Sequence, residues 1–344
     1  MFNNPTKFLF LMTLISGTLI TISANSWFGA WMGLEINLLS FIPLMSTSRN
    51  LFSNEASLKY FLTQALASAT LLFAVILTSL SLSLPNTLMI SMTPLSTLIN
   101  SSLMLKMGAA PFHFWFPGVM EGLSWMNTLT LMTWQKIAPL MLLSYNLQMN
   151  TFIAFIIISS VIIGSLGGLS QTSLRKILAY SSINHLGWLI AALILGENLW
   201  MLYMTTYMFL STAIVFMFNS FKLSHINQIF SMNSCPPIIK FSLFTTLLSL
   251  GGLPPFLGFM PKWLIIQSMV EANLIPIITT MVVMTLLTLF YYLRLSFGAF
   301  MLTYSEVLWN FNYTQNNLNH NITLNLAITS ILGLPICSLL YWML

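Results

Sequence analysis

The sequence contains no aspartate, and charged residues of either sign make up only 5% of its 344 positions. So few charges cannot cover the water-facing surface of a soluble domain of this size. The charges are scattered singly, 6 glutamates against 11 lysines and arginines, with no basic stripe interleaved with aromatic residues. We therefore expect no nucleic-acid partner, despite a pI of about 9.3.

Cysteine is equally scarce. The two cysteines, Cys235 and Cys337, lie far apart and form no CxxC or CxxH pattern. This spacing predicts no metal site, no bound redox centre and no disulfide framework. A glycine-rich nucleotide loop and a flavin signature are also absent, so we expect any redox chemistry to lie outside this chain.

Hydrophobic residues make up 57% of the chain, and the mean hydropathy is +0.86. These values indicate an all-α polytopic membrane protein. The first apolar run is interpreted as an uncleaved span rather than a signal peptide, because no persuasive small-residue cleavage site follows it. The longest polar connection is 310–321. Apolar stretches of about 20 residues predict roughly 11 spans, at about 8–23, 26–46, 56–82, 93–110, 124–147, 151–169, 174–195, 198–221, 238–270 with an interruption, 274–303 and 323–343.

The stretch Leu105–Pro117 places Lys106 directly ahead of a predicted helix break at Gly108 to Pro111. A lysine in hydrocarbon costs roughly 2.5 to 3.5 kcal/mol, so it persists only where it faces protein or internal water. Desolvation also favours the neutral amine, which allows a buried lysine to gain and lose a proton. These properties predict a proton-relay role for Lys106.

Three further titratable side chains fall inside predicted spans. Glu35 lies about nine residues into the second span, too deep to reach the interface, and is interpreted as an ion-pairing or proton-transfer group. A protonated Glu35 that only joins two helices is the alternative. Lys136 lies near the middle of the fifth span, where Pro139 frees a backbone carbonyl, which favours a relay role. His185, near the centre of the seventh span, can donate and accept protons, and a core histidine with satisfied hydrogen bonds is an equal alternative.

The remaining charges are assigned to the membrane interface or to loops. Glu55 and Lys59 stand at i and i+4, which favours a surface ion pair, although a contribution of Lys59 to a polar path stays open. Arg175, Lys176 and Arg294 are interpreted as interfacial residues. Because lysines and arginines fall on both sides of the alternating helices, the positive-inside rule assigns no orientation.

A second predicted helix break repeats the pattern of the first. Gly108–Phe112 and Gly252–Phe256 share the spacing G-x-x-P-F, and a lysine lies near each, Lys106 and Lys262 respectively. Interrupted hydrophobic segments at corresponding positions of two halves indicate inverted repeats with an ion path at their interface. The repeated spacing predicts that Lys106 and Lys262 occupy corresponding elements of the two halves.

Four stretches together carry a resemblance to a known family: Trp31–Asn37, Lys106–Pro117, Gln171–Ser182 with His185, and Gly251–Lys262. They resemble the subunit 2 family of mitochondrial NADH:ubiquinone oxidoreductase, respiratory complex I, whose members are antiporter-like membrane subunits. The resemblance covers essentially the whole chain and fits the animal form, which lacks about three N-terminal helices.

The resemblance implies two inverted repeats of five helices, each with a broken helix, at about 1–148 and 149–305, followed by a polar loop and a last helix at 306–344. It implies that Glu35, Lys106, Lys136 and Lys262 occupy the family's charged positions. His185 would occupy a polar position between the repeats. In this hypothesis Glu35 pairs with Lys106, a shift in that pair changes the proton affinity of Lys136, and His185 with water carries the change to Lys262.

The implied function is that of a core membrane-arm subunit of a proton-pumping NADH:ubiquinone oxidoreductase, multi-pass in the mitochondrial inner membrane. NADH, FMN, Fe–S clusters and ubiquinone are expected in other subunits, so this chain belongs to an enzyme but holds no redox site and no cofactor. The expected partners are the other membrane-arm subunits, including further antiporter-like ones, and inner-membrane lipids.

Two other classes of function remain as alternatives. An independent cation/proton antiporter would share the repeats, but the absence of aspartate and the lysines at most buried positions argue against direct binding of a metal cation. A structural scaffold would use the buried charges only to join helices, and several separate buried lysines with few buried acids would be a costly way to do so.

Overall fold

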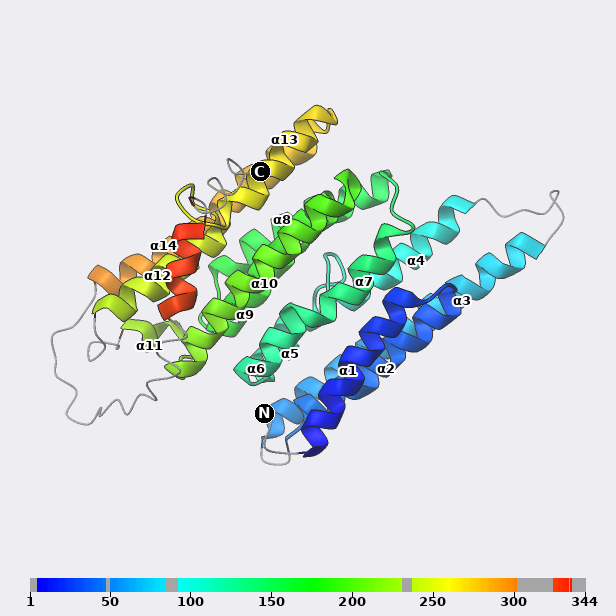
Figure 1. Ribbon diagram of the computed structural model, residues 1–344, viewed down its shortest axis with the longest axis horizontal. Helices are drawn as coiled ribbons and strands as arrows, with labels where there is room; N and C mark the ends of the chain where they lie inside the picture. Colours follow the sequence, from blue (N-terminus) through cyan, green and yellow to red (C-terminus); the bar gives the residue numbers. More distant parts are fainter. Residues whose placement is uncertain are drawn as a thin grey trace. The chain divides into compact units, whose positions relative to one another are not determined.

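The computed structural model describes residues 5–47, 50–83, 92–230, 237–301, 324–333 and 335, and this part of the chain is almost entirely helical (Figure 1). The predicted class, an all-α polytopic membrane protein, is confirmed at this level. Seven described helices are long and apolar enough to cross a membrane. They are α1 (Pro5–Ser23), α2 (Trp27–Met45), α3 (Leu51–Ser83), α8 (Thr151–Leu169), α9 (Leu174–Leu195), α10 (Glu197–Ser220) and α14 (Ile275–Met301).

The other described helices are shorter. Helix α4 (Met92–Met107) lies in the predicted span 93–110, and α5 (Trp115–Gly122) lies between two predicted spans. Two predicted spans each contain two helices: α6 (Trp125–Met132) and α7 (Trp134–Ser144) share 124–147, and α12 (Pro237–Gly251) and α13 (Phe259–Glu271) share 238–270. A five-residue helix, α11 (Ile226–Phe230), and the helix Leu324–Gly333 complete the described set. The predicted interruption of the span 238–270 is confirmed between α12 and α13. The number of 11 transmembrane helices and their arrangement as repeats stay predictions.

The predicted span 124–147 contains two helices, α6 and α7. The helix is interrupted at Thr133, whose backbone angles of φ −109° and ψ −71° depart from the helical range. The Thr133 hydroxyl donates to the Leu129 carbonyl at 2.7 Å, a local side-chain bond that competes with regular helix geometry. Neither proline nor glycine marks this position, so the helix-breaking residues used for the prediction did not find it.

Some predictions fall outside the described residues. These are the polar connection 310–321, the part of the last span beyond residue 335, and both cysteines.

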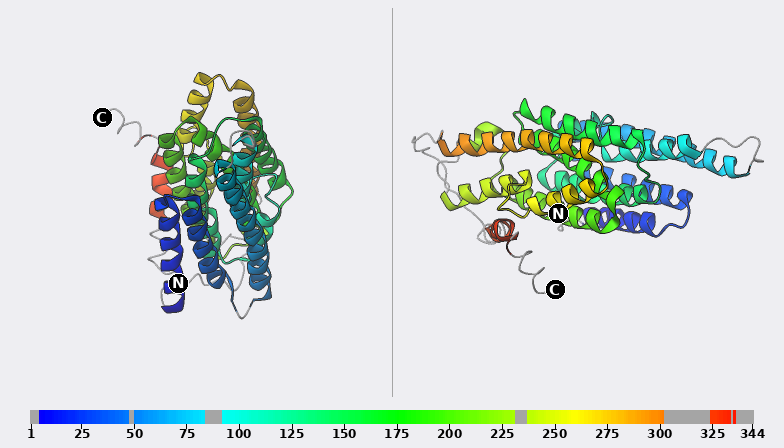
Figure 2. Two further views of the ribbon diagram at one scale, coloured as in Figure 1. Left: turned by 90° about the vertical axis from the view of Figure 1, so that its right-hand side faces the viewer. Right: turned by 90° about the horizontal axis from the view of Figure 1, so that it is seen from above.

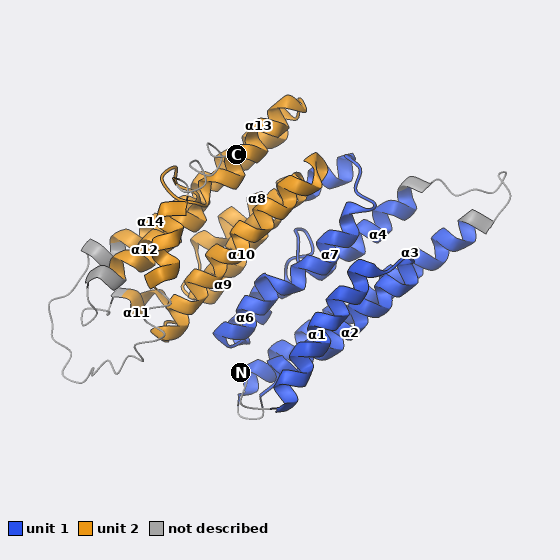
Figure 3. Ribbon diagram, viewed as in Figure 1, with its two compact units in different colours: residues 1–156 blue, residues 157–344 orange. Residues whose placement is uncertain are grey.

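The chain divides into two compact units, Met1–Ile156 and Ile157–Leu344 (Figure 3). Unit 1 contains α1 to α7, and unit 2 contains α9 to α14. Helix α8 begins just before the division and continues into unit 2.

In unit 1, α1 and α2 lie side by side along their length (Figures 1 and 2). Glycine permits this close approach, because a Cβ atom on Gly33 would lie 2.6 Å from Cγ2 and 2.9 Å from the backbone nitrogen of Thr21. Small residues at helix contacts are the usual way in which membrane helices pack closely. Helix α3 packs on α2, α4 and α5, while α7 packs on α1, α4 and α6.

In unit 2, α9 is buried on all sides, and it contacts α10, α13 and α14. Its near-absence of a polar face is typical of a helix in the interior of a membrane bundle. Gly187 of α9 meets α8, since a Cβ atom there would lie 2.5 Å from Cγ2 of Val161. His185 therefore sits on an interior helix of the unit.

The exposed faces of the long helices carry large apolar side chains. Leu19 on α1, Leu66 on α3 and Leu286 on α14 are each more than half exposed. In water such faces would be unfavourable, whereas lipid chains are as apolar as leucine. Their exposure is what a membrane-embedded chain requires.

Candidate functional site

The break in unit 1 is a helix C-terminus closed by Gly108. Gly108 has a φ of +76°, a conformation that glycine adopts without a steric penalty. Its backbone N–H donates to the Leu105 carbonyl at 3.2 Å, and the Ala109 N–H donates to the Met104 carbonyl at 3.1 Å. These two bonds form a Schellman motif, which ends α4 one residue before Gly108.

The break in unit 2 has the same construction. Gly252 has a φ of +84°, and its N–H donates to the Ser249 carbonyl at 3.0 Å. The Leu253 N–H donates to the Leu248 carbonyl at 3.4 Å, which completes a second Schellman motif. The glycine of each G-x-x-P-F stretch therefore ends a helix in the same way, and both predicted breaks are confirmed.

The lysines near the two breaks do not correspond in position. Lys106 belongs to α4, the helix before its break, whereas Lys262 belongs to α13, the helix after its break. The prediction that they occupy corresponding elements is therefore wrong. The G-x-x-P-F spacing determines the glycine turn. It does not determine whether the lysine lies on the helix before the turn or on the helix after it.

Side chains from elsewhere in unit 1 cap the broken end of α4. The Gln64 amide of α3 donates to the Lys106 carbonyl at 3.2 Å, and the Trp115 indole donates to the Leu105 carbonyl at 3.1 Å. The last carbonyls of a helix lack the usual partner four residues on, so the Gln64 bond supplies a partner for the Lys106 carbonyl, and Trp115 adds a second donor to the Leu105 carbonyl that already accepts from Gly108. The backbone on which Lys106 stands is thereby fixed.

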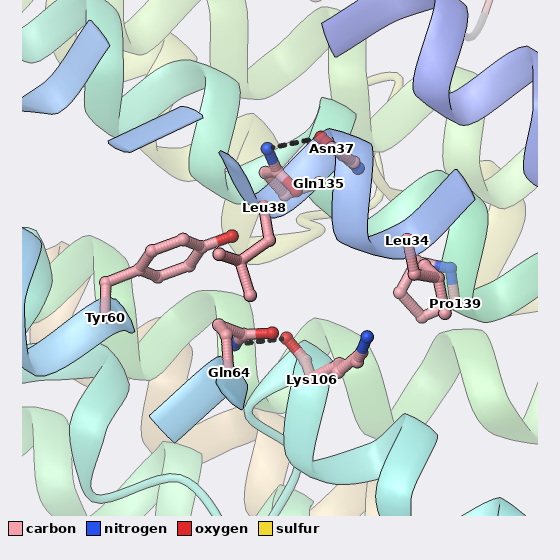
Figure 4. Close-up of a pocket in the computed structure, with 8 residues that line it drawn as sticks. All are labelled: Leu34, Asn37, Leu38, Tyr60, Gln64, Lys106, Gln135 and Pro139. Carbon is pink, nitrogen blue, oxygen red and sulfur yellow. Dashed lines mark hydrogen bonds between the residues drawn. The ribbon is translucent and has the colours of Figure 1, made fainter. Parts of the chain in front are cut away.

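A small cavity of about 10 Å³ lies beside Lys106, about the room that one ordered water needs (Figure 4). The Lys106 side chain itself is only 8% exposed. An amide pair borders the cavity, in which Gln135 of α7 donates to the Asn37 side-chain oxygen of α2 at 2.9 Å. The lining residues are Leu34, Asn37, Leu38, Tyr60, Gln64, Lys106, Gln135 and Pro139.

Glu35 lies in the middle of α2, two residues before Asn37, and is half-buried. Its charge interacts electrostatically with that of Lys106, although the two side chains form no direct ion pair in the described structure. One carboxylate oxygen, Oε1, is buried and accepts no hydrogen bond from any described residue. A buried carboxylate oxygen of this kind normally has a partner, so this position suits a group that exchanges protons or binds water.

Lys136 is the most deeply buried of the three lysines in the site, with only 1% of its surface exposed. Its ammonium nitrogen lies 5.4 Å from the centroid of the Phe116 ring, within the range of a cation–π interaction. Phe116 also packs against the turn at Gly108, because a Cβ atom on that glycine would lie 3.2 Å from the Phe116 Cβ. Phe116 therefore connects the helix break to Lys136.

His185 on α9 is buried between two tyrosines of α10. Its Nδ1 lies 2.8 Å from the Tyr203 hydroxyl, and its ring centroid lies 4.9 Å from that of Tyr207. The Tyr207 hydroxyl interacts with Ser182, one turn before His185. The central position predicted for His185 is therefore polar and hydroxyl-rich.

Lys262 turns back toward the break that precedes it. Its ammonium donates to the Gly251 carbonyl, the last of α12, at 2.8 Å. The same nitrogen lies 6.0 Å from the centroid of Trp188, which stands one turn after His185 on α9. Lys262 is thus both a helix cap and a buried charge beside the helix that carries His185.

The charges assigned to the surface behave differently. Lys59 and Glu55 form an ion pair at 2.5 Å, and their side chains are 53% and 61% exposed. The predicted surface pair is confirmed, and Lys59 is consequently a useful reference for the buried lysines.

Four polar side chains were missed by the sequence reasoning: Asn37, Gln64, Gln135 and Tyr203. Each is nine-tenths or more buried, except Gln135, which is half-buried. The signal that could have found them is the occurrence of amides and a phenol inside long apolar spans, because polar groups at membrane depth need internal partners.

Comparisons with known proteins cover nearly the whole chain. The family profile described as NADH:quinone oxidoreductase/Mrp antiporter, transmembrane, matches residues 24–288. NADH-ubiquinone oxidoreductase chain 2 from Anopheles gambiae is 57% identical over 334 residues, 97% of each chain. The Aedes aegypti protein of the same name is also 57% identical, over 336 residues and 97% of each chain.

A solved structure of respiratory complex I from Thermus thermophilus with bound aureothin contains a similar chain, with a TM-score of 0.83 and 25% identity. The alignment covers 96% of this chain and 78% of that one. Sequence and fold therefore agree over nearly the whole length, and the chain belongs to the NADH:quinone oxidoreductase/Mrp antiporter membrane family.

Proposed function

We propose that Lys106, Lys136 and Lys262 exchange protons with internal water, with Glu35 and His185 as their polar partners. The observation that carries the proposal is the burial of three lysines, each at most 8% exposed, in a helical membrane chain with two broken helices. Identity of 57% to NADH-ubiquinone oxidoreductase chain 2, together with the match to a chain of complex I, makes the chain a membrane-arm subunit of a proton-pumping NADH:ubiquinone oxidoreductase. These residues would supply its part in moving protons or charge.

In unit 1, the electrostatic interaction between Glu35 and Lys106 supports the first step. Protonation of Glu35 would remove a negative charge that favours the Lys106 ammonium, so Lys106 would release a proton more readily. The cavity beside Lys106 has room for a water that could accept it. The Gly108 turn and Phe116 would pass a movement of this region to Lys136.

The electrostatic energies of such steps are large enough to move a proton against a membrane potential. Two unit charges 4 Å apart interact by about 4 kcal/mol at an effective dielectric constant of 20. Moving one charge across a potential of 100 mV requires about 2.3 kcal/mol. A few changes of charge among buried groups could therefore work against a membrane potential.

In unit 2, His185 and Lys262 would serve the equivalent purpose. His185 can accept and donate a proton, and Lys262 lies over Trp188 on the same helix, α9. The bond from Lys262 to the Gly251 carbonyl ties the charge of this lysine to the geometry of the break.

We further propose that this subunit holds no redox cofactor, and that NADH, FMN, Fe–S clusters and ubiquinone bind to other subunits. Its partners would be the other membrane-arm subunits, including antiporter-like ones, and lipids of the mitochondrial inner membrane. The match to a chain of a respiratory complex I structure supports the membrane-arm partners.

The test of the proposal is Lys106→Ala in the assembled complex, with assembly first checked by native gel. Quinone-linked NADH oxidation and proton uptake are then measured in sealed inner-membrane vesicles. We expect both to fall at least fivefold, because the substitution removes a proton-exchanging group but leaves the backbone cap from Gln64 in place. The matched control is Lys59→Ala, which removes an exposed lysine and should change neither rate. Unchanged rates in Lys106→Ala would show that Lys106 is structural and would end the proposal.

A further inference from the structure

Tyr203 is the buried hydrogen-bond partner of His185. Its hydroxyl lies 2.8 Å from Nδ1 of the imidazole, and the two residues are 2% and 7% exposed. We propose that Tyr203 is a positioning residue that holds Nδ1 of His185, so that the imidazole exchanges its proton at Nε2. The inference rests on the proposed role of His185 in proton transfer and assigns the atom at which that transfer occurs.

The fold holds this pair in a fixed register. Gly196 is the only residue between α9, which carries His185, and α10, which carries Tyr203. Such a short connection between two packed helices prevents them from sliding past each other. Tyr207 stands one turn after Tyr203 on the same face of α10, and its ring packs at 4.9 Å from the imidazole. The imidazole is therefore held in position as well as hydrogen-bonded.

The chemistry of the two groups determines their roles. A phenolate buried away from water is unfavourable, so the Tyr203 hydroxyl stays neutral. The hydrogen bond at one imidazole nitrogen sets the function of the other nitrogen. In the tautomer that the proposal assigns, neutral His185 carries its hydrogen on Nδ1, donates it to the Tyr203 oxygen and accepts an incoming proton at Nε2.

In this arrangement, one atom, Nε2 of His185, both gains and loses the transferred proton. An incoming proton forms a new N–H bond with the Nε2 lone pair, and the neutral imidazole becomes an imidazolium. The same bond breaks when the proton leaves, and the electron pair stays on Nε2. Nδ1 keeps its hydrogen and its bond to Tyr203 through both steps, so the ring does not need to rotate.

The groups that face the imidazole are compatible with this role. On α10 they are the phenols Tyr203 and Tyr207, and on α9 Ser182 lies one turn earlier and interacts with the Tyr207 hydroxyl. The charged group packed against α9 from α13 is Lys262, over Trp188. On α14, Tyr292 interacts electrostatically with Tyr207. A proton on His185 is thus placed among neutral hydroxyls and one lysine.

The experiment compares Tyr203→Phe with Tyr291→Phe in the assembled complex. Each substitution deletes one buried phenol oxygen: that of Tyr203 lies at Nδ1 of His185, whereas that of Tyr291, on α14, interacts with Ser181 and Tyr292. Proton uptake per NADH oxidised and the pH profile of turnover are measured in sealed vesicles, per assembled complex. We expect Tyr203→Phe to lower proton uptake per NADH at least threefold and to shift the pH profile. Tyr291→Phe should leave both unchanged.

A second pair of variants tests whether Tyr203 acts through His185. In a His185→Gln background, adding Tyr203→Phe should have no further effect, because the group that Tyr203 positions is already lost. If Tyr203→Phe matches the wild type while His185→Gln is defective, the positioning role is wrong and the relay role of His185 survives. If His185→Gln keeps full proton uptake, the relay role of His185 itself fails. A complex that assembles with Tyr291→Phe but not with Tyr203→Phe would show that Tyr203 is structural.

Discussion

Two lysines of the site, Lys106 and Lys262, combine deep burial with a position at a helix break. Lys262 donates to the carbonyl that ends α12, and Lys106 stands on a turn whose carbonyls are capped by Gln64 and Trp115. A purely structural role would need only a hydrogen-bond donor at these positions. A proton-exchanging role needs an amine that can be charged or neutral.

These two requirements can be separated at Lys262. Lys262→Gln keeps an N–H donor for the Gly251 carbonyl but carries no exchangeable charge, whereas Lys262→Met removes both. We expect both variants to lose proton uptake at least fivefold, and Lys262→Met alone to lower the thermal stability of the assembled complex, by the roughly 1 to 3 kcal/mol of an unpaired buried carbonyl. Proton uptake and thermal unfolding of the purified complex provide the two readouts. Normal proton uptake in Lys262→Gln would show that Lys262 only caps the end of α12 and does not exchange protons.

At the scale of elements, each unit contains one of the two helix breaks at a G-x-x-P-F stretch. Each is a glycine-terminated helix with the same pair of backbone bonds. In unit 1 the turn also supports Phe116, whose ring faces Lys136. A change at the turn should therefore reach two lysines at once.

Gly108→Ala tests this connection. An alanine at a φ of +76° is strained by roughly 1 to 2 kcal/mol, and its Cβ would lie 3.2 Å from the Phe116 Cβ. We expect a lower unfolding temperature of the assembled complex and a NADH oxidation rate reduced severalfold. Gly118→Ala is the matched control, because a Cβ there meets nothing within 4 Å. Equal stability and rate for the two variants would show that the turn does not position the lysines.

Much of this architecture could be predicted from hydropathy and from glycine and proline. The long spans and both breaks are local features, since a run of apolar residues or a G-x-x-P-F stretch determines its own structure. The interruption at Thr133 was not predictable in this way, because neither glycine nor proline marks it. The contacts of Gln64 and Tyr203 depend on which helices lie side by side, which is a property of the tertiary fold.

At the scale of the whole molecule, the family includes both redox-driven complexes and Mrp antiporters. The chain has no aspartate, and its deeply buried charges are lysines, which would repel a metal cation. A direct cation-binding role is therefore disfavoured on electrostatic grounds.

Whether the chain alone exchanges cations for protons can be measured in liposomes that contain the isolated chain and a pH-sensitive dye. When a sodium gradient is imposed, we expect no proton movement above that of empty liposomes. Sodium-driven proton exchange would instead identify an independent antiporter and would contradict the assignment to a redox-coupled relay.

The most direct test of the central claim is proton uptake per NADH oxidised in sealed vesicles that contain the assembled complex with Lys136→Met. Methionine keeps the length and apolar body of the side chain, so the 1% exposed site stays filled while its charge is removed. If the buried lysines carry protons, proton uptake per NADH falls severalfold relative to the Lys59→Met control. If the ratio is unchanged in fully assembled complex, Lys136 carries no proton and the relay account is contradicted.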